Sequence, residues 1–100
     1  MTLSDPVIVL ARWSAAEAHL GAVLELLKSL RAQSLAEAGC LGYEVFEQAD
    51  EPGTLLLLER YRNEQAAQAH RDSSHYREHM DRIRPLLAAR HVDFLRSRDL

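Results

Sequence analysis

The most apolar stretch of the chain is residues 54–62, Thr-Leu-Leu-Leu-Leu-Glu-Arg-Tyr-Arg. Side chains of a strand point alternately to its two faces, so four consecutive leucines place apolar groups on both. A strand with one exposed face alternates apolar and polar residues, whereas such a run is typical of a sheet that is covered on both sides. Residues 7–13, Val-Ile-Val-Leu-Ala-Arg-Trp, predict a second strand of this kind.

Helical periodicity follows the first strand. Between residues 20 and 30, apolar side chains recur at steps of three and four, with charged side chains on the opposite side. This pattern predicts an amphipathic helix that packs on a sheet. We expect the helix to begin at Ser14 or Ala15 and to end near Ala38, because a glycine follows at a position where helices commonly stop.

Two shorter helices are predicted after the leucine-rich strand. The side chain of Asn63 can accept a backbone N–H as the N-cap of a helix over residues 64–71. Ser73 and Ser74 belong to a second group of capping residues, and the helix after them should be disturbed near its end by Pro85. The residues at helical spacing in this second helix are Tyr76, His79 or Met80, Ile83 and Leu87.

Two further strands complete the pattern. Residues 41–48 alternate in part, which predicts a strand. Its shared face carries Leu41, Tyr43 and Val45. The Pro-Gly turn in residues 49–53 joins this strand to the leucine-rich one, so the two should form an antiparallel hairpin. Residues 90–95 predict the fourth strand.

The elements follow one another as strand, helix, strand, strand, helices, strand. This order predicts a single α+β domain over residues 1–100 with the ferredoxin-like split βαβ arrangement, a four-stranded antiparallel sheet with its helices on one face. The second face of the sheet would then be a large exposed apolar patch, which is normally buried against another protein surface. We therefore expect a homodimer that forms through this face.

Composition and charge exclude several classes of function. The 12 basic residues are outnumbered by 15 acidic ones and form no cluster, which argues against nucleic-acid binding. No apolar run approaches the ~20 residues that cross a bilayer, and the chain does not start with the pattern of a signal peptide. We expect no membrane partner and a cytoplasmic location. The single cysteine, Cys40, is interpreted as a small buried apolar residue.

Five short segments carry a resemblance to a known family. They are residues 11–13 (Ala-Arg-Trp), 37–43 (Glu-Ala-Gly-Cys-Leu-Gly-Tyr), 50–54 (Asp-Glu-Pro-Gly-Thr), 59–61 (Glu-Arg-Tyr) and 70–76 (His-x-x-Ser-x-His-Tyr). In this order they resemble the antibiotic biosynthesis monooxygenase family, dimeric α+β barrel proteins that include cofactor-independent quinol monooxygenases. The resemblance implies sheets packed face to face in a dimer, with a small-molecule pocket between sheet and helices in each subunit.

The candidate chemistry is concentrated in the histidines between residues 70 and 79. Imidazole accepts a proton near neutral pH, and a phenol or dihydroquinone that has lost its hydroxyl proton gives an electron to O2 more readily. His75 or His70 is the candidate catalytic base, and the sequence leaves both assignments open. The candidate substrate-binding residues, mainly walls for a planar aromatic ring, are Trp13, Tyr61, Tyr76 and His79.

The predicted function is oxidation of a small, quinol-like aromatic substrate by O2 in a monooxygenase without a cofactor. The alternative is a protein on the same dimeric scaffold that binds a small ligand without reaction or degrades haem. Haem degradation is disfavoured, because the resemblance places Ala11-Arg12 where haem-degrading relatives carry Asn, and His70 where they carry Trp. No metal site is predicted, although residues 75–79 match a His-x-x-Glu-His pattern, because a catalytic zinc site needs a third ligand and a cleft.

The same residues also have a purely structural interpretation. His70 can be a packed helix residue while the other histidines are exposed. A carboxylate on an apolar face demands a partner, so Glu59 is expected to pair with Arg12 or Arg60. Tyr61 would then close the core with its hydroxyl at the surface.

Overall fold

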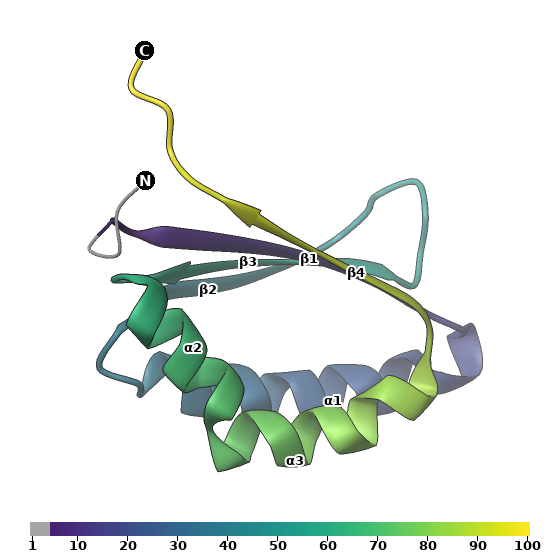
Figure 1. Ribbon diagram of the computed structural model, residues 1–100. Helices are drawn as coiled ribbons and strands as arrows, with labels where there is room; N and C mark the ends of the chain where they lie inside the picture. Colours follow the sequence, from purple (N-terminus) through teal and green to yellow (C-terminus); the bar gives the residue numbers. More distant parts are fainter. Residues whose placement is uncertain (1–4) are drawn as a thin grey trace.

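A four-stranded antiparallel sheet with its helices packed against one face forms the protein (Figure 1). The computed structural model describes residues 5–100. In chain order the elements are β1 (Val7–Ala15), α1 (Glu17–Leu35), β2 (Cys40–Glu47), β3 (Thr54–Tyr61), α2 (Glu64–Asp72), α3 (Ser74–Ile83), the short 3-10 helix η1 (Arg84–Leu86) and β4 (Leu87–Leu95). The predicted α+β, ferredoxin-like arrangement is confirmed. No helix within residues 5–100 is long and apolar enough to span a bilayer.

The two most apolar strands lie at the centre of the sheet. The strand order is β2-β3-β1-β4, and β1 pairs antiparallel with both β3 and β4. The predicted hairpin of β2 and β3 is also confirmed. Gly53 in its turn has φ 91°, a conformation that favours glycine, and a Cβ atom there would lie 2.6 Å from the carbonyl oxygen of Ala15.

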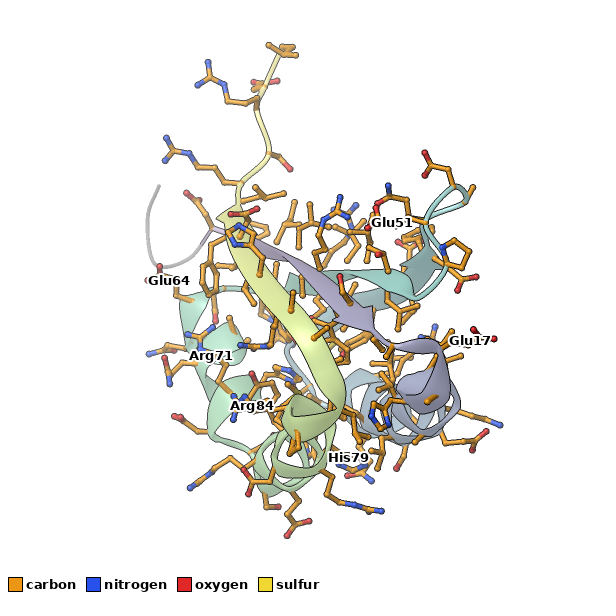
Figure 2. The ribbon with its side chains drawn as sticks, turned by 90° about the vertical axis from the view of Figure 1, so that its right-hand side faces the viewer. Glu17, Glu51, Glu64, Arg71, His79 and Arg84 are labelled. Carbon is orange, nitrogen blue, oxygen red and sulfur yellow. The ribbon has the colours of Figure 1, made fainter. Side chains whose placement is uncertain are left out.

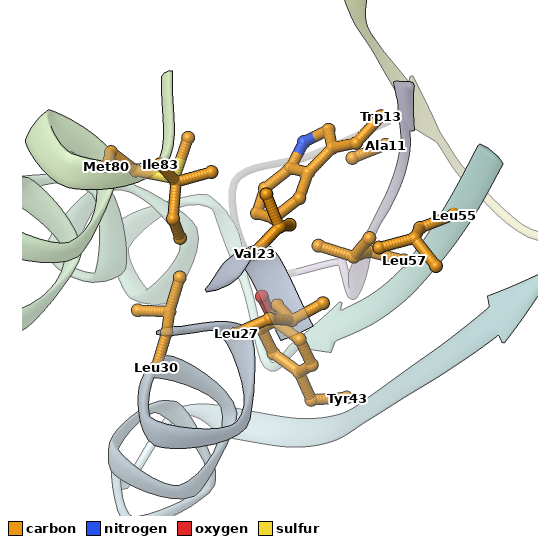
Figure 3. Close-up of a cluster of buried hydrophobic side chains, with 10 residues drawn as sticks. All are labelled: Ala11, Trp13, Val23, Leu27, Leu30, Tyr43, Leu55, Leu57, Met80 and Ile83. Carbon is orange, nitrogen blue, oxygen red and sulfur yellow. The ribbon is translucent and has the colours of Figure 1, made fainter. Parts of the chain in front are cut away.

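The inner face of the sheet and the helices enclose the hydrophobic core (Figure 3). Side chains of β1 and β3 that point to the helices meet the buried side of α1 and α3 there. The core cluster consists of Ala11, Trp13, Val23, Leu27, Leu30, Tyr43, Leu55, Leu57, Met80 and Ile83. Because side chains alternate along a strand, one face of β1 and one face of β3 are buried in this core.

Helix boundaries differ from the prediction by a few residues. α1 begins at Glu17, because β1 continues to Ala15, whose N–H donates to the Gly53 carbonyl at 2.9 Å. It ends at Leu35 instead of near Ala38, and the chain then turns through a Glu37 N–H to Ser34 carbonyl bond of 3.0 Å.

Two apolar residues lie elsewhere than expected. Leu87 belongs to β4 and not to the apolar stripe of α3, because η1, which contains Pro85, separates that helix from the strand. Leu41 does not share a face with Tyr43, because the pairing register shifts between Cys40 and Gly42 and leaves Leu41 58% exposed.

The outer face of the sheet has an apolar centre that no helix within residues 5–100 covers (Figure 1). Leu10 pairs across the strands with Leu58, and both are only half-buried. Phe46, at the β2 edge opposite Leu56, is 48% exposed. An apolar surface of this kind is typical of a protein contact.

Candidate functional site

A cavity of about 240 Å³ lies between the inner face of the sheet and the helices α2 and α3. Its lining is mostly apolar and aromatic, with a few polar groups, as is typical of sites for small organic molecules. The residues around it are Val9, Ala11, Trp13, Leu30, Tyr43, Glu59, Tyr61, Ala67, His70, Arg71, Tyr76, Arg90, Val92 and Phe94. A larger groove of about 700 Å³ runs along α2 and the end of β4, but no histidine lines it.

His70 reaches the cavity from α2. Asn63 caps this helix as predicted, accepting the Ala66 N–H at 2.9 Å. Ala67 and His70, one turn apart, are the buried residues of the helix and face the sheet. The imidazole is packed among aromatic rings, with its centroid 5.1 Å from that of Tyr61 and 4.9 Å from that of Tyr76.

The carboxylate of Glu37 holds two imidazoles. Its Oε2 atom lies 2.9 Å from Nδ1 of His70 and 2.5 Å from Nε2 of His75. An ionised carboxylate only accepts hydrogen bonds, so both rings donate to it. Because Nδ1 of His70 carries the hydrogen that it donates to Glu37, the unprotonated nitrogen of the ring is Nε2. This nitrogen is the one that can accept a proton as a general base.

Burial keeps this base neutral. Desolvation lowers the pKa of His70 from its usual value of 6.5, and the hydrogen bond from Nδ1 to Glu37 opposes that effect only in part. His70 is 3% exposed. At neutral pH the ring therefore carries an unprotonated nitrogen inside the protein.

Glu59 and Tyr61 continue the polar network along β3. The Tyr61 hydroxyl donates to Oε1 of Glu59 at 2.5 Å, and the same oxygen lies 3.7 Å from Nε2 of His70. Burial raises the pKa of Glu59 to about 7, against the smaller, lowering effect of the Tyr61 hydrogen bond. A buried carboxyl group that changes protonation near neutral pH thus lies beside the histidine.

The structural interpretation of this pair is wrong in two respects. Glu59 does not pair with Arg12 or Arg60, because strand alternation places both arginines on the outer face, where Arg12 donates to Gln48 at 2.8 Å. Tyr61 does not bring its hydroxyl to the surface, since the whole side chain is 1% exposed.

The indole of Trp13 adds an unpaired donor to the cavity wall. Trp13 is 3% exposed, and its Nε1 atom has no hydrogen-bond partner among residues 5–100. Buried polar groups in proteins are nearly always hydrogen-bonded. An oxygen atom of a bound ligand could accept this N–H.

The cavity brings together four of the six predicted site residues, Trp13, Tyr61, His70 and Tyr76. His75 does not line it, although its ring contacts the same carboxylate oxygen of Glu37 as His70 does and lies 6.2 Å from the His70 ring between centroids. His79 lies away from it, near the bottom of Figure 2, because α3 directs this side chain to α1, where Nε2 is 3.0 Å from the Ser29 hydroxyl.

Several residues of the site were not predicted. Glu59 is one of them, and it shares a strand face with Leu57 and with the predicted site residue Tyr61, so its proximity to Tyr61 follows from the sequence alone. Glu37 has no such signal, because 33 residues separate it from His70 and only the packing of the α1–β2 turn against α2 joins them.

The network also contains donors that metal ions use. The nearest ligand atoms of Glu37, His70 and His75 lie within 4.8 Å of one another. Two imidazoles and a carboxylate suit zinc or iron. In the described structure the Glu37 carboxylate accepts hydrogen bonds from both rings.

Comparison with known proteins identifies relatives over most of the chain. The model of the family described as "Antibiotic biosynthesis monooxygenase" matches residues 6–82. "Putative monooxygenase Rv0793" of Mycobacterium tuberculosis is 36% identical over 85 residues, which are 85% of this chain and 83% of the relative. "Putative monooxygenase YcnE" of Bacillus subtilis is 32% identical over 62% of this chain and 65% of its own length.

Solved structures share the whole fold. The structure of Rv0793 has a TM-score of 0.90 at 35% identity and covers 96% of this chain and 98% of its own. The structure of PA3566 from Pseudomonas aeruginosa has a TM-score of 0.88 at 27% identity, with 99% and 100% covered. These relatives have the same architecture from β1 to β4.

The raised pKa of Glu59 predicts a specific effect of pH on stability. Because the folded state binds this proton more tightly than the unfolded chain does, the stabilisation is complete below pH 4.5 and is lost as the pH rises through about 7. The loss can reach about 3 kcal/mol. Glu59→Gln, which stays neutral, should therefore gain stability relative to the unsubstituted protein over this range.

Urea unfolding of both proteins at one concentration and at several pH values measures the difference. Titrating groups remote from Glu59 are common to the two proteins and cancel in the difference. Curves of stability against pH that run parallel would show that Glu59 titrates at an ordinary pKa.

Proposed function

Because the chain belongs to the antibiotic biosynthesis monooxygenase family, we propose that it oxidises a small, quinol-like aromatic compound with O2 and without a cofactor. One observation carries the proposal: a neutral imidazole, held by a carboxylate, forms part of the inner wall of a largely aromatic cavity. This arrangement is suited to removing a proton from a bound hydroxyl group.

His70 is the base in this mechanism. Its Nε2 atom takes the hydroxyl proton of the substrate, and Glu37 stabilises the imidazolium that forms. His75, which donates to the same oxygen of Glu37, fixes the position of the carboxylate and is not itself in contact with the cavity. The two candidate bases thus take different roles, with His70 acting on the substrate and His75 positioning its partner.

The phenolate then reacts with O2 directly. One electron passes to O2, the two radicals combine at a ring carbon, and loss of water from the resulting hydroperoxide leaves a hydroxylated quinone. For naphthohydroquinone the products are hydroxynaphthoquinone and water, so the substrate itself supplies all four electrons. No external reductant is needed.

The cavity favours a flat, aromatic substrate. Tyr61 and Tyr76 both pack against the His70 ring, and Trp13 lines the same space. Aromatic rings interact well with such surfaces, and the unpaired indole N–H of Trp13 can donate to a substrate oxygen. A chain that only binds such a ligand would use the same walls but would not need the buried base.

Replacement of His70 tests the catalytic step. In His70→Gln the cavity keeps a polar side chain but loses the base, so O2 consumption above autoxidation should fall by about 10²- to 10⁴-fold in kcat/KM. An oxygen electrode with naphthohydroquinone and related quinols as substrates measures this rate, and circular dichroism checks that the variant folds.

His79→Gln is the matched control, since His79 lies on α3 but does not line the cavity. Its rate should equal that of the unsubstituted protein. If no quinol raises O2 uptake above autoxidation, or if His70→Gln is as active as the control, the protein is a ligand-binding member of the family and not an oxygenase of this kind.

We also propose that the protein is a homodimer formed through the outer face of the sheet. The apolar centre of this face includes Leu10 and Leu58, and its surroundings carry both signs of charge. Arg12 and Arg60 lie on the same face as Glu44, the cross-strand partner of Leu58. A copy related by a two-fold axis can therefore pair its acidic groups with basic groups of the first.

Leu58→Glu should convert the dimer to a monomer, because it places two charges in the centre of an apolar interface. Sedimentation velocity at micromolar concentration measures the change in mass. The control is Leu24→Glu, whose leucine is 42% exposed on α1 and away from the sheet face. A monomeric unsubstituted protein, or a dimeric Leu58→Glu variant, would contradict the proposed interface.

A further inference from the structure

Two arginines lie at the open side of the cavity. Arg71 comes from α2 and Arg90 from the edge strand β4, and both belong to the cavity lining. Figure 2 views the molecule from the β4 side, with Arg71 beside that strand. Arg90 and its neighbour in the lining, Phe94, are exposed, whereas Trp13 and His70 are buried. The cavity thus meets solvent at β4 and ends at the histidine.

Neither guanidinium forms an ion pair in the part of the chain that the structure describes. Among residues 5–100, no carboxylate oxygen lies within 4.0 Å of Arg71 or Arg90. Arg71 donates to the amide oxygen of Gln68 at 2.8 Å and lies 5.3 Å from the centre of the Phe94 ring. Arg90 donates to the Tyr76 hydroxyl at 3.1 Å. Each guanidinium has five N–H groups, so most of their donors remain available.

The other ionisable groups of the cavity do not cancel this charge. Among the described residues of the lining, Glu59 is the one carboxyl group, and although both arginines act on it electrostatically, a single carboxylate can offset only one of the two guanidinium charges. Asp93 lies on β4 between two cavity residues, but strand alternation directs it to the outer face, opposite Leu10. A chain with a net charge of −3 therefore has a positively charged entrance to an apolar cavity.

We infer that the substrate is an aromatic carboxylate, whose anionic group binds Arg71 and Arg90 at the entrance while its ring lies between Trp13 and Tyr61. Guanidinium groups bind carboxylates through paired, charge-assisted hydrogen bonds. The inference rests on the proposed function and sets the orientation of the substrate. With its carboxylate at the entrance, its far end is directed inward to His70, where the reacting hydroxyl is required.

Binding of a matched acid and amide tests this inference without any oxidation. Naphthoate and naphthamide have nearly the same shape, differ in charge, and carry no hydroxyl group that O2 can attack. Isothermal titration calorimetry of the unsubstituted protein should give a dissociation constant at least tenfold lower for naphthoate. The preference should weaken as the salt concentration rises.

Substitution of the arginines should remove the preference. Arg71→Gln and Arg90→Gln should each weaken naphthoate binding about tenfold and leave naphthamide binding nearly unchanged. Arg90→Lys, which keeps the charge but not the planar fork, should retain part of the preference. Arg98→Gln is the control, because Arg98 lies beyond β4 and outside the cavity lining, and it should change neither affinity.

Several results would overturn the inference. Equal affinities for the acid and the amide, no binding of either at millimolar concentration, or a preference that both arginine variants retain would each do so. These outcomes are distinct from a failure of the proposed function. If the protein prefers naphthoate but oxidises no quinol, the proposed oxygenase reaction is wrong and the carboxylate site stands. If it oxidises neutral quinols in preference to carboxylated ones, the carboxylate inference is wrong and the oxygenase reaction stands.

Discussion

The pairing of β1 with β3 determines both the core and the site. In this register Val9 lies opposite Glu59, and Trp13 lies opposite Leu55. Because alternate residues point to opposite faces, the same pairing places the inward aromatic and acidic groups together under the helices and leaves Leu10 and Leu58 together on the outer face. A one-residue slip would exchange the two faces and destroy the cavity.

The site itself depends on the cost of burying ionisable groups. Glu59 and His70 are almost fully buried, and a buried charge without a partner is strongly unfavourable. Desolvation lowers the pKa of His70 and raises that of Glu59, which favours the neutral form of each. Each group also has a hydrogen-bond partner, Glu37 for His70 and Tyr61 for Glu59. Desolvation makes these groups costly to bury, and it also brings their pKa values into a range that suits proton transfer near neutral pH.

The arrangement of the helices explains how distant residues form one network. Glu37 lies in the turn after α1, His70 on α2 and His75 on α3. The Arg62 N–H donates to the Gly39 carbonyl at 2.8 Å, which ties this turn to the end of β3. A Cβ atom on Gly39 would clash with the Ala66 side chain, so glycine permits the close approach of the turn to α2. Backbone packing thus brings the carboxylate to both histidines.

Local patterns predicted the fold well and the site only in part. Four consecutive leucines, the Asn63 cap and the Pro-Gly turn each act over a few residues, and these short-range rules gave the sheet, α2 and the hairpin. Leu41 and Leu87 were misplaced, because a register shift and a 3-10 turn alter periodicity in ways that composition does not reveal.

The polar part of the site follows from tertiary packing. His70, Tyr61 and Trp13 were chosen for their chemistry, and the structure brings them to one cavity. Glu37 and Arg90 were not predicted as site residues, because each is distant in the sequence from the residue that it contacts, His70 and Tyr76 respectively. The sequence could not distinguish His70 from His75, since both contact Glu37 and only the packing of α2 places the His70 ring, and not that of His75, in the cavity wall.

The most direct measurement follows the oxygen atoms of O2 into the product. The protein, treated with a chelator, is supplied with naphthohydroquinone under isotopically labelled O2, and the product is analysed by mass spectrometry. Direct oxygenation in the cavity predicts hydroxynaphthoquinone with one labelled oxygen atom, formed faster than in the absence of protein. Unlabelled product, or a rate no higher than that of autoxidation, would contradict a cofactor-free monooxygenase reaction at this site.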